Sequence, residues 1–253
     1  MSEPPDVVAA FDADAIGWDG AYDAPGFRGD WRRSRLAAAL ELLGAGPGDV
    51  LDAGMGPGRL LEELERRGWT VWGVDASPRM VNLARGRVPA ARERILEGRL
   101  ENLPFADGTF DAVFSYSVLQ HFSKPDVRQT LGECARVLTS TGFSLIQMAN
   151  ALGLRSLFHQ ARRRFREPKL FEVRYWTPRE LRDAFTAIVG PSTISIDGFL
   201  SLNAQPEEAR LLPARFRMIV RLSEALRAIG TWAPPLGTFA DSLYVESRRK
   251  QAG

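Results

Sequence analysis

Residues 50–60 contain the segment that most restricts what this 253-residue chain can fold into. Residues typical of a buried strand, Val50 to Ala53, run directly into Gly54, Gly56 and Gly58, and a helical pattern opens at Arg59. Glycine lets a backbone take positive φ and approach a ligand closely. Free N–H groups at the start of the following helix favour a negatively charged group. The segment therefore predicts a strand–loop–helix unit with a ligand at its loop.

Short β-rich runs alternate with helical stretches from Val50 onward, which predicts a doubly wound, Rossmann-like α/β fold. The expected strands are Val50–Ala53, Thr70–Val74, Ile95–Gly98, Phe110–Ser115, Phe143–Met148, Ile194–Ile196 and Leu243–Val245. The expected helices are Trp31–Leu43, Arg59–Arg67, Pro78–Arg87 and Asp126–Leu138, one that opens at Thr177-Pro178, and one between Pro206 and Gly230. Ser77 and Thr177 are N-cap residues by type and spacing, and Gly68 follows a basic last turn as a C′ glycine.

The spacing of the glycines separates this loop from the loop that binds dinucleotides. That fingerprint, G-x-G-x-x-G, requires a glycine at position 59, where this chain has Arg59. Asp75 ends the next expected strand, in the crevice at the carboxyl ends of the strands where such folds bind ligands. A carboxylate there can accept hydrogen bonds from both hydroxyls of a ribose. The alternative role for Asp75 is to cap the helix that follows the strand.

These features resemble the class I S-adenosylmethionine-dependent methyltransferases, closest to the branch that acts on small molecules and lipids such as quinones. The resemblance covers roughly Val50 to Met148 and also rests on Leu103-Pro104-Phe105, Phe110-Asp111 and Val118-Leu119-Gln120-His121. It implies a seven-stranded, mostly parallel sheet whose last strand, Leu243–Val245, is antiparallel. It also implies S-adenosyl-L-methionine as the cofactor.

The resemblance assigns cofactor contacts position by position. Gly54, Gly56 and Gly58 would lie against the methionine part, Asp52 would support the loop or the ammonium group, and Asp75 would hold the ribose. Ser115 would offer its backbone carbonyl near the ammonium, Leu100 would meet the adenine, and Gln120 could orient cofactor or acceptor. One departure concerns Arg99, because the family commonly has an acidic residue there that accepts a hydrogen bond from adenine. A guanidinium group cannot accept one, so either stacking and backbone contacts hold the adenine or Glu101 or Asn102 substitutes.

Methyl transfer from a sulfonium is an in-line displacement, so a general base is needed only when the acceptor must lose a proton. His121, near the rim of the expected cleft, is the leading candidate for that base. Packing or hydrogen bonding is the alternative role. Candidate acceptor-site residues are Tyr22, Tyr116, His159 and Tyr175, each of which could instead be a packing or surface residue.

A single domain is expected over residues 1–253. It divides into N-terminal cap helices (1–45), a cofactor-binding core (46–148), lid and acceptor-site insertions (149–242) and a final strand (243–247). In the insertion, apolar residues recur at helical spacing at Leu154, Leu157, Phe158, Ala161 and Phe165, with arginines on the other face. This stripe is expected to face the core rather than a membrane, and the arginines are either a solvated face or a site for an anionic acceptor.

Composition limits which disulfides, metal sites, cellular locations and activities can be expected for this chain. With one cysteine, Cys134, and two histidines, neither a disulfide framework nor a structural metal site is expected. The acidic N-terminus lacks a signal-peptide pattern and no apolar run is long enough to span a membrane, so a cytoplasmic location is expected. No nucleic-acid motif accompanies the arginines. The expected activity is methylation of a small-molecule or lipid-like acceptor, which can be anionic, with O-methylation slightly preferred over C- or N-methylation. The alternatives are a catalytically silent S-adenosylmethionine-binding protein and a nicotinamide-dependent oxidoreductase.

Overall fold

A computed structural model describes residues 40–166, 168, 172–199 and 237–250, the single positions 222, 225, 226 and 229, and positions 9, 12, 13, 15–17 and 19 near the N-terminus. Most of the expected helices at Trp31–Leu43 and Pro206–Gly230 therefore lie outside the described residues, as does Tyr22. No helix in the described part of the chain is both long and apolar enough to cross a bilayer.

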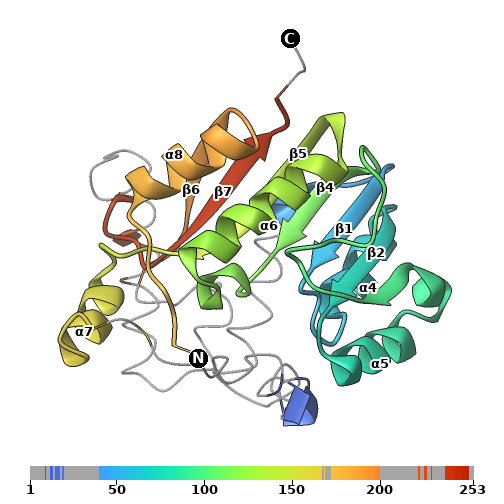
Figure 1. The fold of residues 1–253 in the computed structure, drawn as a ribbon, viewed down its shortest axis with the longest axis horizontal. Helices are drawn as coiled ribbons and strands as arrows, with labels where there is room; N and C mark the ends of the chain where they lie inside the picture. The colour runs from blue at the N-terminus through green and yellow to red at the C-terminus, as the bar shows by residue number, and fades with distance from the viewer. Residues whose placement is uncertain are drawn as a thin grey trace.

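The described strands form one seven-stranded sheet, which confirms the predicted architecture (Figure 1). Its order is β3-β2-β1-β4-β5-β7-β6. The strands are β1 (Asp49–Ala53), β2 (Thr70–Asp75), β3 (Ile95–Glu97), β4 (Phe110–Ser115), β5 (Leu138–Ala149), β6 (Ser192–Gly198) and β7 (Ser242–Arg248). The first five run parallel, and β7 is antiparallel to both of its neighbours. The glycine loop follows β1, so it lies at the carboxyl edge in the middle of the sheet.

Helices pack on both faces of this sheet because side chains along each strand alternate between the faces. The helices are α4 (Arg59–Arg66), α5 (Pro78–Arg87), α6 (Lys124–Val137), α7 (Leu154–Arg162) and α8 (Pro178–Ile188), with 3₁₀ turns η1 (Pro89–Arg94) and η2 (Leu119–His121). Within β1, Leu51 packs in a core cluster with α6 and α8, whereas Val50 packs in a second cluster with α4 and α5. In Figure 1, α6 and α8 cross one face of the sheet, and α4 and α5 lie beside β1 and β2.

The predicted helix boundaries have the expected local causes. The Ser77 side chain accepts a hydrogen bond from the backbone N–H of Met80 at 3.2 Å, which begins α5. Thr177 and Glu180 form a complete capping box at the start of α8. Gly68 has a φ of 86°, the left-handed conformation of a C′ residue.

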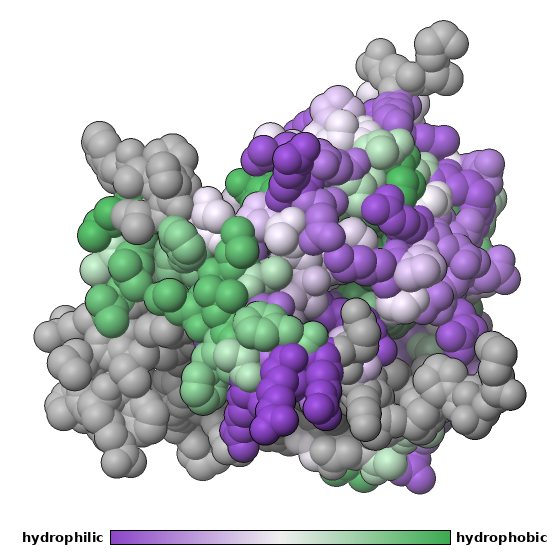
Figure 2. All heavy atoms as spheres, turned by 60° about the vertical axis from the view of Figure 1, so that its left-hand side comes forward, coloured by the Kyte–Doolittle hydropathy of each residue, from purple (hydrophilic) through white to green (hydrophobic). Residues whose placement is uncertain are grey.

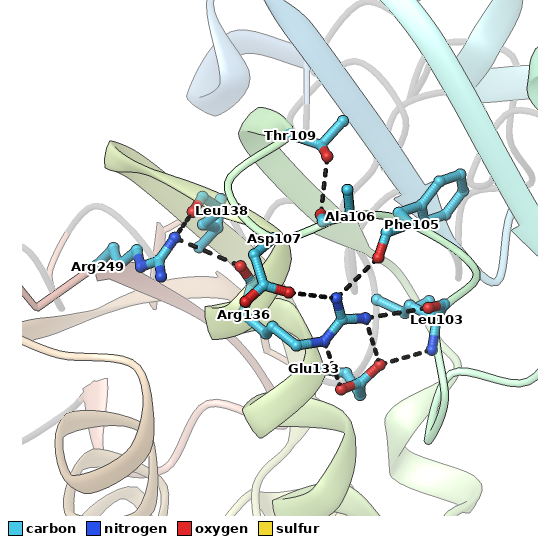
Figure 3. A network of polar contacts seen from close by, with 9 residues as sticks. All are labelled: Leu103, Phe105, Ala106, Asp107, Thr109, Glu133, Arg136, Leu138 and Arg249. Carbon is cyan, nitrogen blue, oxygen red and sulfur yellow. Dashed lines mark hydrogen bonds and ion pairs between the residues drawn. The ribbon is translucent and has the colours of Figure 1, made fainter.

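The loop between β3 and β4 is held by one arginine of α6 (Figure 3). The Arg136 guanidinium donates to the carbonyls of Leu103 at 3.0 Å and Phe105 at 2.7 Å, and it pairs with Glu133 and Asp107 at 2.8 Å each. Glu133 also accepts from the Leu103 N–H at 2.7 Å. These bonds lower the pKa of Glu133, with Arg136 as the main cause. The loop that follows the expected adenine contact is thereby fixed to the helix layer.

The orientation predicted for the apolar stripe of the insertion is wrong. Leu154, Phe158 and Phe165 are 49%, 63% and 68% exposed, and Ser156 is the buried residue of α7. The cause lies in what holds the helix. Asp241, just before β7, accepts hydrogen bonds from the backbone N–H groups of Arg155 at 2.7 Å and Ser156 at 2.9 Å. This contact turns the polar side of α7 toward the protein and the apolar side outward.

Candidate cofactor site

The glycine loop is a tight turn fastened to the end of β2. Gly54, Gly56 and Gly58 all have positive φ, at 81°, 53° and 76°. The Gly54 N–H donates to the Val74 carbonyl at 2.8 Å. A Cβ at position 54 would lie 2.5 Å from a Val118 methyl group, so the close approach of the loop after β4 requires glycine there. At Gly56, by contrast, a Cβ would meet nothing within 4 Å, so the loop has an open side.

Asp75 organises the glycine loop through its carboxylate. Its carboxylate accepts from the Gly56 N–H and from the Ser77 N–H, each at 2.9 Å. Burial raises the pKa of Asp75, and these backbone bonds oppose that rise. The capping role and the ligand role are compatible, since a carboxylate has about four acceptor positions and the backbone N–H groups of Gly56, Ser77 and Ala76 use three of them. The ribose contact itself stays a prediction.

Asp52 is a buried carboxylate below the loop. It is 3% exposed, and its pKa is raised to about 8, first by burial and then by the nearby negative charge of Asp75. No cationic side chain pairs with it among the residues that the structure describes. A buried carboxylate of this kind is stabilised by a cation that enters the site.

The adenine side of the site keeps the departure noted in the sequence. Arg99 is exposed and pairs with Glu101 at 3.1 Å, so the carboxylate that could substitute as an acceptor is already engaged. Leu100 is buried and belongs to the core cluster beneath α6. Asn102 is exposed. The contact of Leu100 with adenine and the role of Arg99 therefore stay predictions.

A buried polar chain that the sequence analysis missed holds the loop after β4. Ser117 has a φ of 61°, uncommon for a residue with a side chain. Its N–H donates to the Gln147 side chain at 2.9 Å; Gln147 donates to the Ser242 hydroxyl at 2.7 Å, and Ser242 to Asp197 at 2.5 Å. In the sequence, the feature that could have indicated this chain of hydrogen bonds is a glutamine inside the apolar run of β5. Nearby, the Ser115 hydroxyl donates to the Ala53 carbonyl at 2.7 Å, which joins β4 to β1.

Gln120 and His121 lie at the same loop. The Gln120 amide donates to the Ser117 hydroxyl at 3.1 Å and lies 3.4 Å from Nε2 of His121. Arg174 donates to the backbone carbonyls of Gln120 and His121, at 2.7 and 2.5 Å. The segment before α8 is thus fastened over the loop, and Tyr175 comes with it. His121 is 9% exposed, so its role as a base stays a prediction.

The other candidate acceptor residues are spread over different environments. The Tyr116 ring lies 6.2 Å from the Tyr244 ring, within the sheet's α4–α5 side. Tyr175 is partly buried beneath the Arg163 guanidinium, 5.3 Å from its ring. His159 lies on exposed α7, where it accepts a hydrogen bond from Arg155 at 3.2 Å. The described contacts therefore join Arg174 to Gln120 and His121, whereas the side chains of Tyr175 and His159 both lie near Arg155 and Arg163.

Two N-terminal carboxylates, also missed, meet the basic residues around the glycine loop. Asp19 pairs with Arg59 at 3.0 Å and with Arg87 at 2.8 Å. Asp12 accepts from the Ser77 hydroxyl at 2.7 Å and from the Arg79 N–H at 3.0 Å, which lowers the pKa of Asp12. The acidic excess of the first 30 residues was the available signal.

Known proteins match this chain in both sequence and fold. Residues 51–146 match the methyltransferase domain family. A demethylmenaquinone methyltransferase of Tropheryma whipplei is 39% identical over 115 residues, 44% of this chain and 45% of the relative. A malonyl-[acyl-carrier protein] O-methyltransferase of Serratia marcescens is 34% identical over 148 residues, 54% and 52% of the two chains. The chain thus spans about half the length of these curated relatives.

A crystal structure of an S-adenosylmethionine-dependent methyltransferase from Thermotoga maritima shares the fold. It covers 97% of this chain and 100% of its own, with a TM-score of 0.64 and 16% identity. The matched residues contain the last three residues of β1, the glycine loop, Asp75 and most of β5, which build the site described above. Residues 51–146 therefore form a methyltransferase domain within the fold of the class I S-adenosylmethionine-dependent methyltransferases.

Proposed function

We propose that this protein is an enzyme that transfers the methyl group of S-adenosyl-L-methionine to a small-molecule or lipid-like acceptor. The observation that carries the proposal is the unpaired, buried Asp52 carboxylate beneath an open glycine loop. S-Adenosylmethionine carries two positive groups, an ammonium and a sulfonium. A nicotinamide dinucleotide brings a negative pyrophosphate instead, which would keep Asp52 protonated and gain no charge pairing from it.

The residues of the site suit the rest of this cofactor. Gly56 leaves space for the amino-acid part, and the acceptor position left on Asp75 suits a ribose hydroxyl. When bound, the cofactor supplies a methyl group already activated by a sulfonium sulfur. The protein's part is to align the acceptor with that methyl group and to exclude water.

The loop after β4 performs the alignment in this proposal. Gln147 holds the Ser117 backbone in its uncommon conformation, and Gln120 and His121 follow within one turn. For a hydroxyl acceptor, the hydroxyl proton must leave when the oxygen is methylated. His121 would receive that proton. A carbanion-like acceptor or an unprotonated amine would not need His121 as a base.

The relatives suggest the class of acceptor. The names of two relatives give demethylmenaquinone and malonyl-[acyl-carrier protein] as what those proteins methylate. We propose an acceptor of this range, with O-methylation slightly ahead of C- or N-methylation, and an enzyme that works in the cytoplasm.

Calorimetric titration tests the cofactor assignment. Three ligands are compared: S-adenosylmethionine, the uncharged 5′-methylthioadenosine, which lacks the amino-acid part, and NADH. Asp52→Asn should weaken S-adenosylmethionine by about 10- to 100-fold, the loss of one charge-assisted contact, and leave methylthioadenosine unchanged. Asp75→Ala should weaken both adenosine ligands. Asp183→Asn, at a side chain 70% exposed on α8, is the matched control.

Two outcomes would contradict the proposal. Preferential binding of NADH would favour the oxidoreductase. Equal weakening of both adenosine ligands by Asp52→Asn would show that Asp52 does not contact the ammonium group of the cofactor. Methyl release to a panel of quinol, phenol and carboxylate acceptors then tests catalysis. Tight binding with no methyl release to any acceptor would favour a silent binding protein, the alternative to which the unusual Arg99 points.

A further inference from the structure

Helix α7 has its apolar and polar sides reversed relative to a helix that covers a protein core. Leu154, Leu157, Phe158 and Ala161 recur at helical spacing on one side, and all are exposed. The opposite side packs on the protein through Ser156 and Gln160, and Gln160 donates to the Ala151 carbonyl at 2.8 Å. A helix on a protein in water normally buries its apolar side. The apolar side of α7 is therefore uncovered by the described part of the chain.

Arginines border this apolar side and follow it. Arg155 and Arg162 are seven residues, or about two helical turns, apart on one flank of α7. Arg164 and Arg166 follow in the segment directly after the helix. All four are exposed, and residues 151–166 contain no acidic residue. We call the exposed side chains of Leu154, Leu157, Phe158 and Phe165 together with these four arginines the α7 surface. Figure 2 shows this side of the molecule, where a broad hydrophobic area lies next to strongly hydrophilic side chains.

We propose that the α7 surface docks on an anionic lipid bilayer. An interfacial helix combines Leu and Phe on one side with arginines along its polar flank, so the apolar side enters the boundary of the bilayer and the arginines meet lipid phosphates. A second copy of this chain would bring its own arginines against these, with no acidic residue to pair with them. A nucleic acid would use the arginines but leave the leucine and phenylalanine side chains in water.

The position of α7 connects this surface to the site. The helix begins five residues after β5 ends, at the sheet edge that carries the glycine loop. Docking would place the entrance to the acceptor site at the bilayer. This second step rests on the proposed function, since a lipid-like acceptor would then reach the enzyme from the membrane. The docking itself does not depend on it.

Sedimentation with vesicles, without cofactor, tests the docking. The protein should bind vesicles of equal parts phosphatidylcholine and phosphatidylglycerol, should not bind phosphatidylcholine alone, and should dissociate at high salt. Arg162→Gln/Arg166→Gln should lower the partition coefficient by about 30-fold, since each basic residue near the surface contributes about fivefold. Leu154→Ser/Phe158→Ser should lower it by about tenfold or more. Leu42→Ser and Arg66→Gln/Arg248→Gln, exposed on other elements, should match the wild type.

The proposal is overturned if the wild type does not bind the mixed vesicles or if the α7 variants bind as the wild type does. A single-stranded RNA that binds the wild type and Leu154→Ser/Phe158→Ser equally, and displaces the vesicles, would assign the surface to nucleic acid instead. Light scattering that shows a dimer lost in Leu154→Ser/Phe158→Ser would assign it to self-association. Circular dichroism of each variant keeps a folding defect apart from a docking defect. Because methyl release is measured without vesicles, failure of docking and failure of the proposed function are distinguishable.

Discussion

Asp52→Asn should make the cofactor-free protein more stable, although it removes a residue expected to bind the cofactor. In the folded protein the pKa of Asp52 is raised from 3.8 to about 8, by burial and by Asp75. At a pH between these two pKa values, Asp52 is ionised in the unfolded chain but keeps its proton in the folded protein. Stability is therefore fully present below about pH 4 and falls as pH rises through the folded pKa near 8. Asparagine has nothing to titrate, so the variant lacks this loss.

The size of the effect follows from the shift. Each pH unit between the two pKa values costs about 1.4 kcal/mol, so at pH 7 the wild type has lost about 4 kcal/mol through Asp52. A buried amide without full hydrogen bonding costs about 1–3 kcal/mol at every pH. The pH dependence separates the two contributions. The difference in unfolding free energy between variant and wild type should increase by about 3 kcal/mol from pH 5 to pH 7.

Urea denaturation followed by tryptophan fluorescence at half-unit steps from pH 5 to pH 8 provides the measurement. Asp75 titrates in the same direction, so the difference between the two proteins is more informative than either curve. The Asp183→Asn variant, altered at an exposed carboxylate, should follow the wild type. Parallel curves for Asp52→Asn and wild type would refute the reasoning, because Asp52 would then be ionised in the folded protein.

Four further variants test the loops around the site. Gly54→Ala places a methyl group 2.5 Å from Val118 at a positive φ and should cost about 1–3 kcal/mol in urea denaturation; no recovery on adding Val118→Ala would count against the close approach. Asp19→Asn removes two partly buried ion pairs and should cost about 1 kcal/mol, and a thermal midpoint equal to that of the wild type would exclude a stabilising role. Gln147→Leu leaves the Ser117 N–H without its acceptor and should lower kcat by about tenfold or more while KM for S-adenosylmethionine changes little; the reverse pattern would contradict a positioning role. With a hydroxyl acceptor, His121→Gln should lower kcat by about 100-fold or more, and an unchanged kcat would exclude His121 as the base.

The sheet could be predicted from sequence because its signals are local. Each parallel strand is a short apolar run that ends in a turn or cap residue, and Pro78–Arg87 was predicted with the boundaries that the structure shows. β5 was predicted too short. It begins at Leu138, directly after α6, and its first residues pass through the polar stretch before Phe143 with a register shift against β4. A polar stretch on a strand that extends past its neighbour carries no β pattern of its own.

The site was predictable only where a residue acts from its own loop. Gly54, Asp52 and Asp75 lie within one strand–loop–helix–strand unit, so their spacing contains the arrangement. The Gln147–Ser242 bond joins residues 95 positions apart and depends on the register of β7 against β5. Such a contact exists only once the sheet has formed. The orientation of α7 depends in the same way on a distant residue, Asp241.

The order of the strands has a consequence for how the chain assembles. β6 is an edge strand whose single neighbour in the described sheet is β7, and β7 is formed by residues 242–248, near the end of the chain. During synthesis β6 cannot join the sheet until residues 242–248 have left the ribosome. A ribosome stalled near residue 235 should therefore carry a structured β1–β5 unit with residues 192–198 unpaired and susceptible to protease.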